Sequence, residues 1–273
     1  WEQIFEIEDD SQFEKFALKA FDFQIDNNPI YAAYSTLILK GKKPRKIAEI
    51  PFLPISFFKT NQIICKGKAV EEIFESSGTQ GEKSKHLVSD ISLYKKSFLK
   101  SFKKIYGNID DYCILSLLPN YIDQGGSSLI YMVDHLIIKS KNKDSGSYYK
   151  NYKDLSIKIK KLEEKKQKTI LFGVSHALLD LAHKFPQKLK NTYIIETGGT
   201  KGKRKEILKE ELHQKLKLAF SLKYIHSEYG MTELLSQSYS KGDGLFTSPP
   251  WKKILIRDIN DPLSLVPQNK SGG

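Results

Sequence analysis

Three segments of the sequence contain residues that could bind a phosphate-rich ligand. The first reads Ser76-Ser77-Gly78-Thr79-Gln80-Gly81-Glu82-Lys83-Ser84-Lys85. Glycines let backbone N–H groups approach an anion, hydroxyls add donors, and lysines supply positive charge. The run departs from the P-loop pattern, because Glu82 stands where that pattern needs glycine. From this segment alone, a phosphate cradle and a flexible surface turn both stay open.

The second segment, residues 227–233, reads Ser-Glu-Tyr-Gly-Met-Thr-Glu and follows an expected strand. Gly230 permits a tight turn, and Tyr229 could stack on a base. Thr232 could donate to a phosphate, while Glu233 could bind Mg²⁺ through a carboxylate oxygen. The alternative is an ordinary strand-to-helix turn, whose first turn favours Thr and Glu.

The third segment, Glu196-Thr-Gly-Gly-Thr-Lys-Gly202, has three glycines in five positions at a strand end. This spacing suits close backbone approach to a flat ligand, although common turns have it too. Ser175 stands in a near match to a nucleophile elbow, but Ala177 replaces the second glycine, so we expect a helix start. The six histidines and two cysteines form no metal-binding pattern, and the cysteines favour free thiols in a reducing cytoplasm.

The elements around these segments alternate between strand and helix. We expect helices over residues 1–40 with a break at Pro29, then an extended connector through Pro51–Pro54. Expected strands cover residues 62–65, 72–74, 112–118, 169–172, 193–196, 223–227 and 254–257, and expected helices cover 89–105, 175–185 and 206–218. Alternation of this kind predicts a layered α/β domain with mostly parallel sheets. We divide the chain into a helical segment with its connector, 1–60, and an α/β domain, 61–273.

The charge of the chain favours anionic partners without specifying nucleic acid. Lys and Arg number 44 against 32 Asp and Glu, a formal net charge of +12. The lysines lie in separate short clusters, and no nucleic-acid-binding motif accompanies them. No run of 18 apolar residues is present, so we expect no transmembrane segment and a cytoplasmic location.

Taken in order, the three segments resemble the ATP-binding motifs of the adenylate-forming superfamily. Ser76–Lys85 resembles its SSGTTGxPK loop, Gly198-Gly199 its adenine-flanking pair, and Tyr229–Glu233 its YGxTE motif. Longer stretches, including Pro51–Lys59, Leu171–Asp180, Glu196–Glu206 and Ser227–Gln237, look like the LuxE-type acyl-protein synthetases. The similarity runs from about Phe21 to Pro262.

The resemblance implies that ATP and Mg²⁺ activate a long-chain carboxylic acid as acyl-AMP. The acyl group would then pass to a thiol of the enzyme and on to an acyl-reductase partner. The resemblance implies phosphate binding by Ser76, Ser77, Gly78, Thr79 and Gly81 with Lys83 or Lys85, adenine contacts from Gly198, Gly199, Tyr229 and Gly230, an α-phosphate contact from Thr232, a Mg²⁺ contact from Glu233, and an acyl pocket lined by Tyr121.

Two departures from the family pattern leave alternatives open. Gln80 replaces the second Thr of the loop, and Ser84 stands where the terminal Lys would fall. The sequence also ends before the expected ribose-binding Asp, lid and acyl-accepting Cys, so we expect this polypeptide alone to bind nucleotide poorly. The alternatives are an aryl- or phenylacetate-type acyl-CoA ligase and a non-catalytic carrier or scaffold of the same fold.

Overall fold

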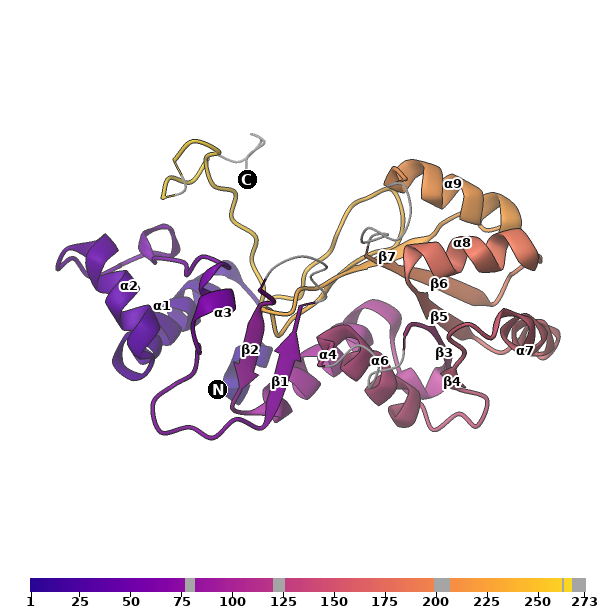
Figure 1. The fold of residues 1–273 in the computed structure, drawn as a ribbon, viewed down its shortest axis with the longest axis horizontal. Helices are drawn as coiled ribbons and strands as arrows, with labels where there is room; N and C mark the ends of the chain where they lie inside the picture. Colours follow the sequence, from indigo (N-terminus) through magenta and orange to yellow (C-terminus); the bar gives the residue numbers. More distant parts are fainter. Residues whose placement is uncertain (77–81, 120–125, 199–206, 262, 267–273) are drawn as a thin grey trace.

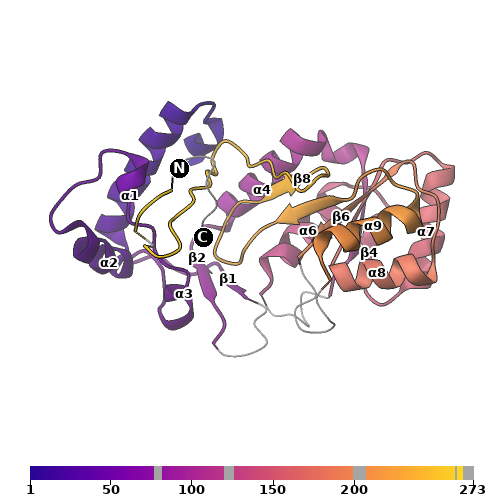
Figure 2. The same ribbon diagram turned by 90° about the horizontal axis from the view of Figure 1, so that it is seen from above.

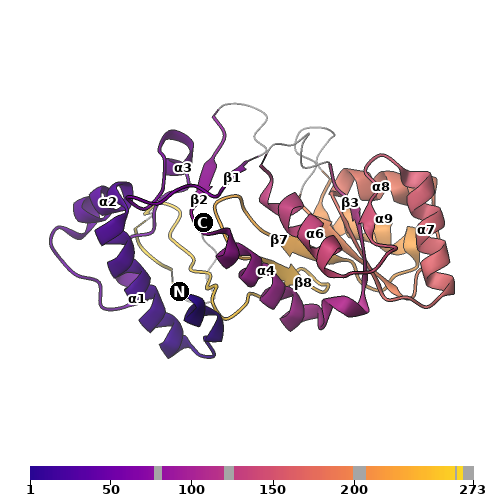
Figure 3. The same cartoon turned by 90° about the horizontal axis from the view of Figure 1, so that it is seen from below.

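The computed structural model describes residues 1–76, 82–119, 126–198, 207–261 and 263–266. Figure 1 shows a group of helices at the N-terminal end of the chain and a larger α/β body. The antiparallel strands β1 (Glu72–Glu75) and β2 (Lys85–Val88) lie between them in all three views (Figures 1–3).

A six-stranded sheet forms the centre of the α/β body. Its strands are β3 (Cys113–Leu117), β4 (Gly146–Ser147), β5 (Thr169–Gly173), β6 (Thr192–Thr197), β7 (His226–Tyr229) and β8 (Ser238–Ser240). They lie in the order β4-β3-β5-β6-β7-β8, and all neighbours are parallel except the β7–β8 pair. The predicted α/β class with a mainly parallel sheet is confirmed.

Helices cover both faces of this sheet (Figure 3). One face packs against α4 (Ile91–Tyr106) and α6 (Ser128–Lys139), and the other against α7 (Tyr152–Glu164), α8 (Ser175–Lys184) and α9 (Lys209–Phe220). Successive strand residues point to opposite faces, so Ile114 enters the first core and Leu115 the second. Because both faces are covered, the central strands β3 and β5 are buried along their whole length and are mostly apolar.

The N-terminal helices are η1 (Glu2–Glu6), α1 (Asp10–Asn27), α2 (Pro29–Leu39), η2 (Ile47–Glu49) and α3 (Phe57–Thr60); η3 (Ile109–Asp111) precedes β3. The predicted break at Pro29 falls between α1 and α2. Asn28 caps α2 by accepting from the Tyr31 N–H, and Pro29 occupies the first helical position. Proline is favourable at this position because it has no N–H, and the N–H of any other residue there would have no partner within the helix.

Two predicted strands are wrong. Residues 62–65 join no sheet and lead instead to the C-terminal end of α1. There the Lys66 N–H donates to the Asn27 carbonyl, and the Cys65 thiol lies 3.9 Å from Gln24 Oε1. Residues 254–257 find no strand beside them among the described residues, and Arg257 makes only an isolated bridge to Leu265. Apolar composition alone does not supply the neighbouring backbone that a strand requires.

No helix among the described residues has both the length and the apolar character needed to cross a bilayer.

Candidate nucleotide and acid-activation site

The first candidate segment connects β1 to β2. Ser76 and Ser84 close the base of this connection: the Ser76 N–H donates to the Ser84 carbonyl, and the Ser84 N–H donates to Ser76 Oγ, each at 3.0 Å. Ser84, which stands in place of the family's lysine, is therefore buried and part of the hairpin closure. Ser77, Gly78, Thr79 and Gly81 lie outside the described residues.

The two lysines of this segment both lie close to one carboxylate. Lys83 Nζ is 3.7 Å and Lys85 Nζ 3.4 Å from the oxygens of Glu75. All three side chains are partly exposed, so these ion pairs are weak and could yield to a polyphosphate. Both lysines lie at the hairpin base, and the geometry does not show which of them would bind phosphate.

The second candidate segment lies against this hairpin. His86, in β2 directly after Lys85, lies with its Nδ1 2.9 Å from the Thr232 carbonyl oxygen, across 146 residues of sequence. A carbonyl can only accept, so Nδ1 carries the hydrogen. Burial lowers the pKa of His86, while the Thr232 contact and the nearby charge of Glu233 act in the opposite direction. The neutral histidine thus joins the β1–β2 hairpin to the Tyr229–Glu233 turn.

The hairpin also contacts the loop that enters α6. The Glu75 N–H donates to the Gly126 carbonyl at 2.9 Å. Gly126 has φ +72°, and a Cβ there would lie 2.7 Å from the Ile73 carbonyl oxygen. Glycine therefore allows the two backbones to pack this closely. Tyr121, the predicted acyl-pocket residue, lies outside the described residues.

The third candidate segment ends on the same edge of the sheet. Parallel β6 and β7 pair Thr197 with Glu228, so Gly198 and Tyr229 leave neighbouring strands at the same level. Gly198 has φ +74°, a left-handed conformation that favours glycine. Carboxyl ends of parallel strands are where α/β folds bind ligands. Gly199 is not among the described residues.

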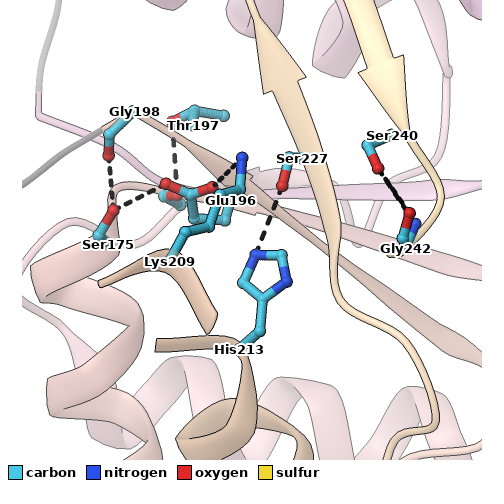
Figure 4. Close-up of polar contacts among 10 residues, drawn as sticks. Ser175, Glu196, Thr197, Gly198, Lys209, His213, Ser227, Ser240 and Gly242 are labelled. Carbon is cyan, nitrogen blue, oxygen red and sulfur yellow. Dashed lines mark hydrogen bonds and ion pairs between the residues drawn. The ribbon is translucent and has the colours of Figure 1, made fainter. Parts of the chain in front are cut away.

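A buried network fixes the Gly198 turn (Figure 4). Ser175 Oγ lies 2.8 Å from Glu196 Oε1 and 2.6 Å from the Gly198 carbonyl oxygen, and Lys209 Nζ lies 3.7 Å from Glu196 Oε2. Ser175 is the first residue of α8 and 2% exposed. Its hydroxyl serves structure and is not presented to solvent as a nucleophile would be.

Tyr229 presents a half-exposed ring at this edge. Tyr229 as a residue is 44% exposed, and its ring makes an edge contact with Phe246 at 6.2 Å between centroids. Lys252 Nζ lies 4.9 Å from the ring centroid. The exposed face can accept a flat ligand, and the lysine adds positive charge beside it.

Sequence analysis did not single out Glu228 and Lys252. Glu228 precedes Tyr229 in β7, and burial raises its pKa to about 8, with Lys252 lowering it and Glu196 adding to the rise. A Cβ on Gly230 would lie 2.7 Å from Glu228 Oε1, so this glycine makes room for the carboxyl group. Glu228 could have been suspected from its place inside the second candidate segment, directly after the expected strand 223–227. Lys252 gave no such signal, because it comes from a distant irregular segment.

No family model matches the sequence, and no curated protein matches it either. Solved structures of a 2-hydroxyisobutyryl-CoA ligase do match. Its complex with 2-HIB-AMP and CoA in the thioesterification state gives a TM-score of 0.64 at 10% identity, covering 96% of this chain and 59% of the ligase. An open conformation with the same ligands gives 0.61 at 9% identity, covering 92% and 61%.

The chain shares the α/β fold of this solved ligase. At these identities the likeness establishes the fold alone, and the chain spans about three fifths of the length of the solved ligase. Within this fold, the described candidate residues come from the β1–β2 hairpin, from the end of β6 and from β7.

The donor set fits a magnesium ion that is held mainly by a nucleotide. Among the described residues, no three His, Cys, Asp or Glu side chains gather into a metal cage. Glu233 would offer a single carboxylate, close enough to His86 to affect its pKa. Mg²⁺ is usually bound by one or two carboxylates together with substrate phosphates, so Glu233 beside the hairpin base suits this arrangement.

Proposed function

We propose that this protein activates a carboxylic acid with ATP as an acyl adenylate and transfers the acyl group to a thiol. The observation that carries the proposal is the His86–Thr232 contact, which holds the hairpin base against the Tyr229–Glu233 turn. This contact joins the first candidate segment to the second, 146 residues later, and the β6–β7 pairing puts the third beside the second. The fold, which is that of a ligase solved with an acyl-AMP, supports the same proposal.

In this proposal the acid's carboxylate attacks the α-phosphorus of ATP, and pyrophosphate leaves. Both reactants are anions, so their approach requires nearby positive charge and N–H donors. Lys83 and Lys85 would exchange Glu75 for phosphate oxygens, and Thr232 would donate to the α-phosphate. Glu233 would hold Mg²⁺ by one carboxylate oxygen, and the bound ion would supply positive charge beside the phosphates. Tyr229 would stack on the adenine beside Gly198.

For the second step we propose a protein thiol as acceptor and a long-chain acid as substrate, with an acyl-reductase as the partner. The support is the resemblance of the sequence to LuxE-type synthetases over most of its length. Neither described cysteine serves as the acceptor thiol in this scheme. Cys113 is fully buried in β3, where burial raises its pKa to about 11. Cys65 lies beside Gln24 of α1, and partial burial raises the pKa of its thiol as well. Coenzyme A is the alternative acceptor, favoured by the solved ligase bound to CoA.

The test is ATP–pyrophosphate exchange by the full-length protein across carboxylic acids of increasing chain length. Acid-dependent exchange is expected, with the highest rate for long-chain acids. Labelled acid should then remain on the protein as a thioester that hydroxylamine releases. Exchange followed by consumption of coenzyme A would replace the acyl-protein assignment with a CoA ligase. Absence of exchange with every acid, in a folded protein, would reject acid activation altogether.

A further inference from the structure

A second group of functional side chains lies at the opposite edge of the sheet. A cavity of about 810 Å³ opens there. Tyr112 lines it just before β3, Tyr193 near the start of β6, and His226 at the start of β7. The candidate activation site lies beyond the other end of β7, so the cavity is a separate site.

Aromatic rings form much of the cavity wall. Tyr106 and His226 stack with centroids 5.7 Å apart and planes at 22°, and Tyr106 Oη lies 3.1 Å from His226 Nδ1. Tyr193 lies 5.2 Å from His226 and 6.5 Å from Tyr112, measured between ring centroids. One of these pairs is stacked and two are tilted, and together they give the cavity an aromatic wall that suits a planar aromatic guest.

The charge of the cavity favours an anion. Burial lowers the pKa of His226 to about 4, with Lys241 adding to the effect, so the imidazole is neutral at pH 7. Lys104 and Lys241 line the cavity, and neither forms an ion pair with any described residue. Asp243 offsets one of the two positive charges. One cation is left uncompensated beside the aromatic wall.

The rim of the cavity is held in place before any ligand binds. Ser240 Oγ donates to the Gly242 carbonyl at 2.8 Å (Figure 4). Gly242 has φ +144°, and a Cβ there would lie 2.6 Å from Tyr224 Cδ1. A side chain at residue 242 would therefore push against the Tyr224 ring that lines the cavity.

We propose that this cavity binds a small planar aromatic carboxylate. The rings would stack on the aromatic plane, and Lys104 and Lys241 would attract the carboxylate. This site does not depend on the proposed acid activation, since it shares no residue with that site. A bound carboxylate would contact β7 at its first residue, His226, whereas Tyr229 of the activation site is its last residue.

The experiment is isothermal titration of the protein with four probes. 4-Hydroxybenzoate carries ring and charge, benzyl alcohol only the ring, cyclohexanecarboxylate only the charge, and dodecanoate a flexible chain. 4-Hydroxybenzoate is expected to bind with a Kd below about 1 mM, and the other three at least about tenfold more weakly. Equal binding of all four, tighter binding of dodecanoate, or no binding of 4-hydroxybenzoate would overturn the proposal.

Variants then locate the bound probe. Lys104→Ala and Lys241→Ala are each expected to weaken 4-hydroxybenzoate binding about fivefold, the effect of losing one exposed charge contact. Gly242→Ala should weaken it further by displacing Tyr224. Lys103→Ala, which removes an exposed lysine next to Lys104 that does not line the cavity, is the matched control and should change nothing.

Glu233→Gln separates this proposal from the activation site. It should lower pyrophosphate exchange about 100-fold or more while leaving 4-hydroxybenzoate binding intact. If binding instead survives Lys104→Ala, Lys241→Ala and Gly242→Ala but is lost in Glu233→Gln, the probe occupies the activation site and the cavity proposal fails.

Discussion

At the scale of single residues, Glu228 is the side chain whose burial has the clearest physical consequence. Its pKa, about 8 in the fold, lies above the 4.5 of an unperturbed Glu because burial disfavours the charged form. Between these values the folded protein holds one more proton than the unfolded chain. The free energy of unfolding therefore falls as pH rises from about 4.5 to about 8, by up to about 1.4 kcal/mol per pH unit from this group.

Glu228→Gln should remove this dependence, because the amide stays neutral at every pH. Urea unfolding at pH 5, 6.5 and 8 is the measurement, and the variant is expected to gain stability relative to the parent as pH rises. Glu164→Gln, at an exposed position of α7, controls for general loss of negative charge. Parallel pH profiles for parent and Glu228→Gln would show that the carboxyl group is not held neutral.

Glu233 is the residue on which the proposed magnesium contact rests. Glu233→Gln keeps the shape of the side chain but removes its charge, so we expect acid-dependent pyrophosphate exchange to fall about 100-fold or more, the scale seen when one preorganised electrostatic contact is lost. Steady-state exchange at saturating Mg-ATP is the measurement. A rate within twofold of the parent's would leave Glu233 without a role in metal binding.

At the scale of elements, the site depends on how closely β1 approaches the loop before α6. Gly126→Ala places a Cβ 2.7 Å from the Ile73 carbonyl oxygen and also strains a residue at φ +72°. Gly41→Ala brings the backbone strain without the steric clash, because Gly41 has φ +82° and no atom lies within 4 Å of the added Cβ. We expect Gly126→Ala to lower the free energy of unfolding by about 1–3 kcal/mol more than Gly41→Ala does.

Thermal unfolding of the two variants side by side measures this difference. In Gly126→Ala, pyrophosphate exchange should also fall, because β1 leads directly into the Ser76 loop. Gly41 lies just beyond α2, far in sequence from the candidate segments, and its variant should retain exchange. Equal destabilisation by both would mean that β1 yields to the added methyl group.

At the scale of the whole molecule, the N-terminus is anchored to the α/β body by an apolar contact. Phe5 is 6% exposed and meets Trp251 edge to face at 5.2 Å, and the Trp251 indole N–H donates to Ser97 of α4. Ion pairs surround this contact, such as Lys96 with Glu2 at 2.7 Å, but their carboxylates are largely exposed. Solvent and salt screen such pairs, so the rings provide most of the attachment.

Phe5→Ala should therefore cost about 3 kcal/mol of stability, as expected for deleting a buried ring. Glu2→Gln, three residues away, should leave the unfolding midpoint unchanged at physiological salt. Urea unfolding of both variants is the measurement. A larger loss from Glu2→Gln than from Phe5→Ala would mean that charge holds the N-terminus in place.

The sequence by itself determined the class of fold, and it selected the candidate segments by their residue types. Apolar runs such as Cys113–Leu117 specify buried parallel strands, because both faces of such a sheet are covered. Ser76, Tyr229 and Thr232 are predicted ligand contacts because phosphates and bases require particular donors and rings, and local sequence displays these residue types.

Only the tertiary structure decided which residues meet. His86 reaches Thr232 through the packing of a hairpin against a turn 146 residues later, and no local pattern encodes that distance. The same holds for Lys252 beside Tyr229, and for the failure of residues 62–65 and 254–257 to become strands. Whether an apolar run pairs, and whether a carboxyl group such as Glu228 is neutral, depends on the backbone and solvent around it. Those surroundings exist only in the folded chain.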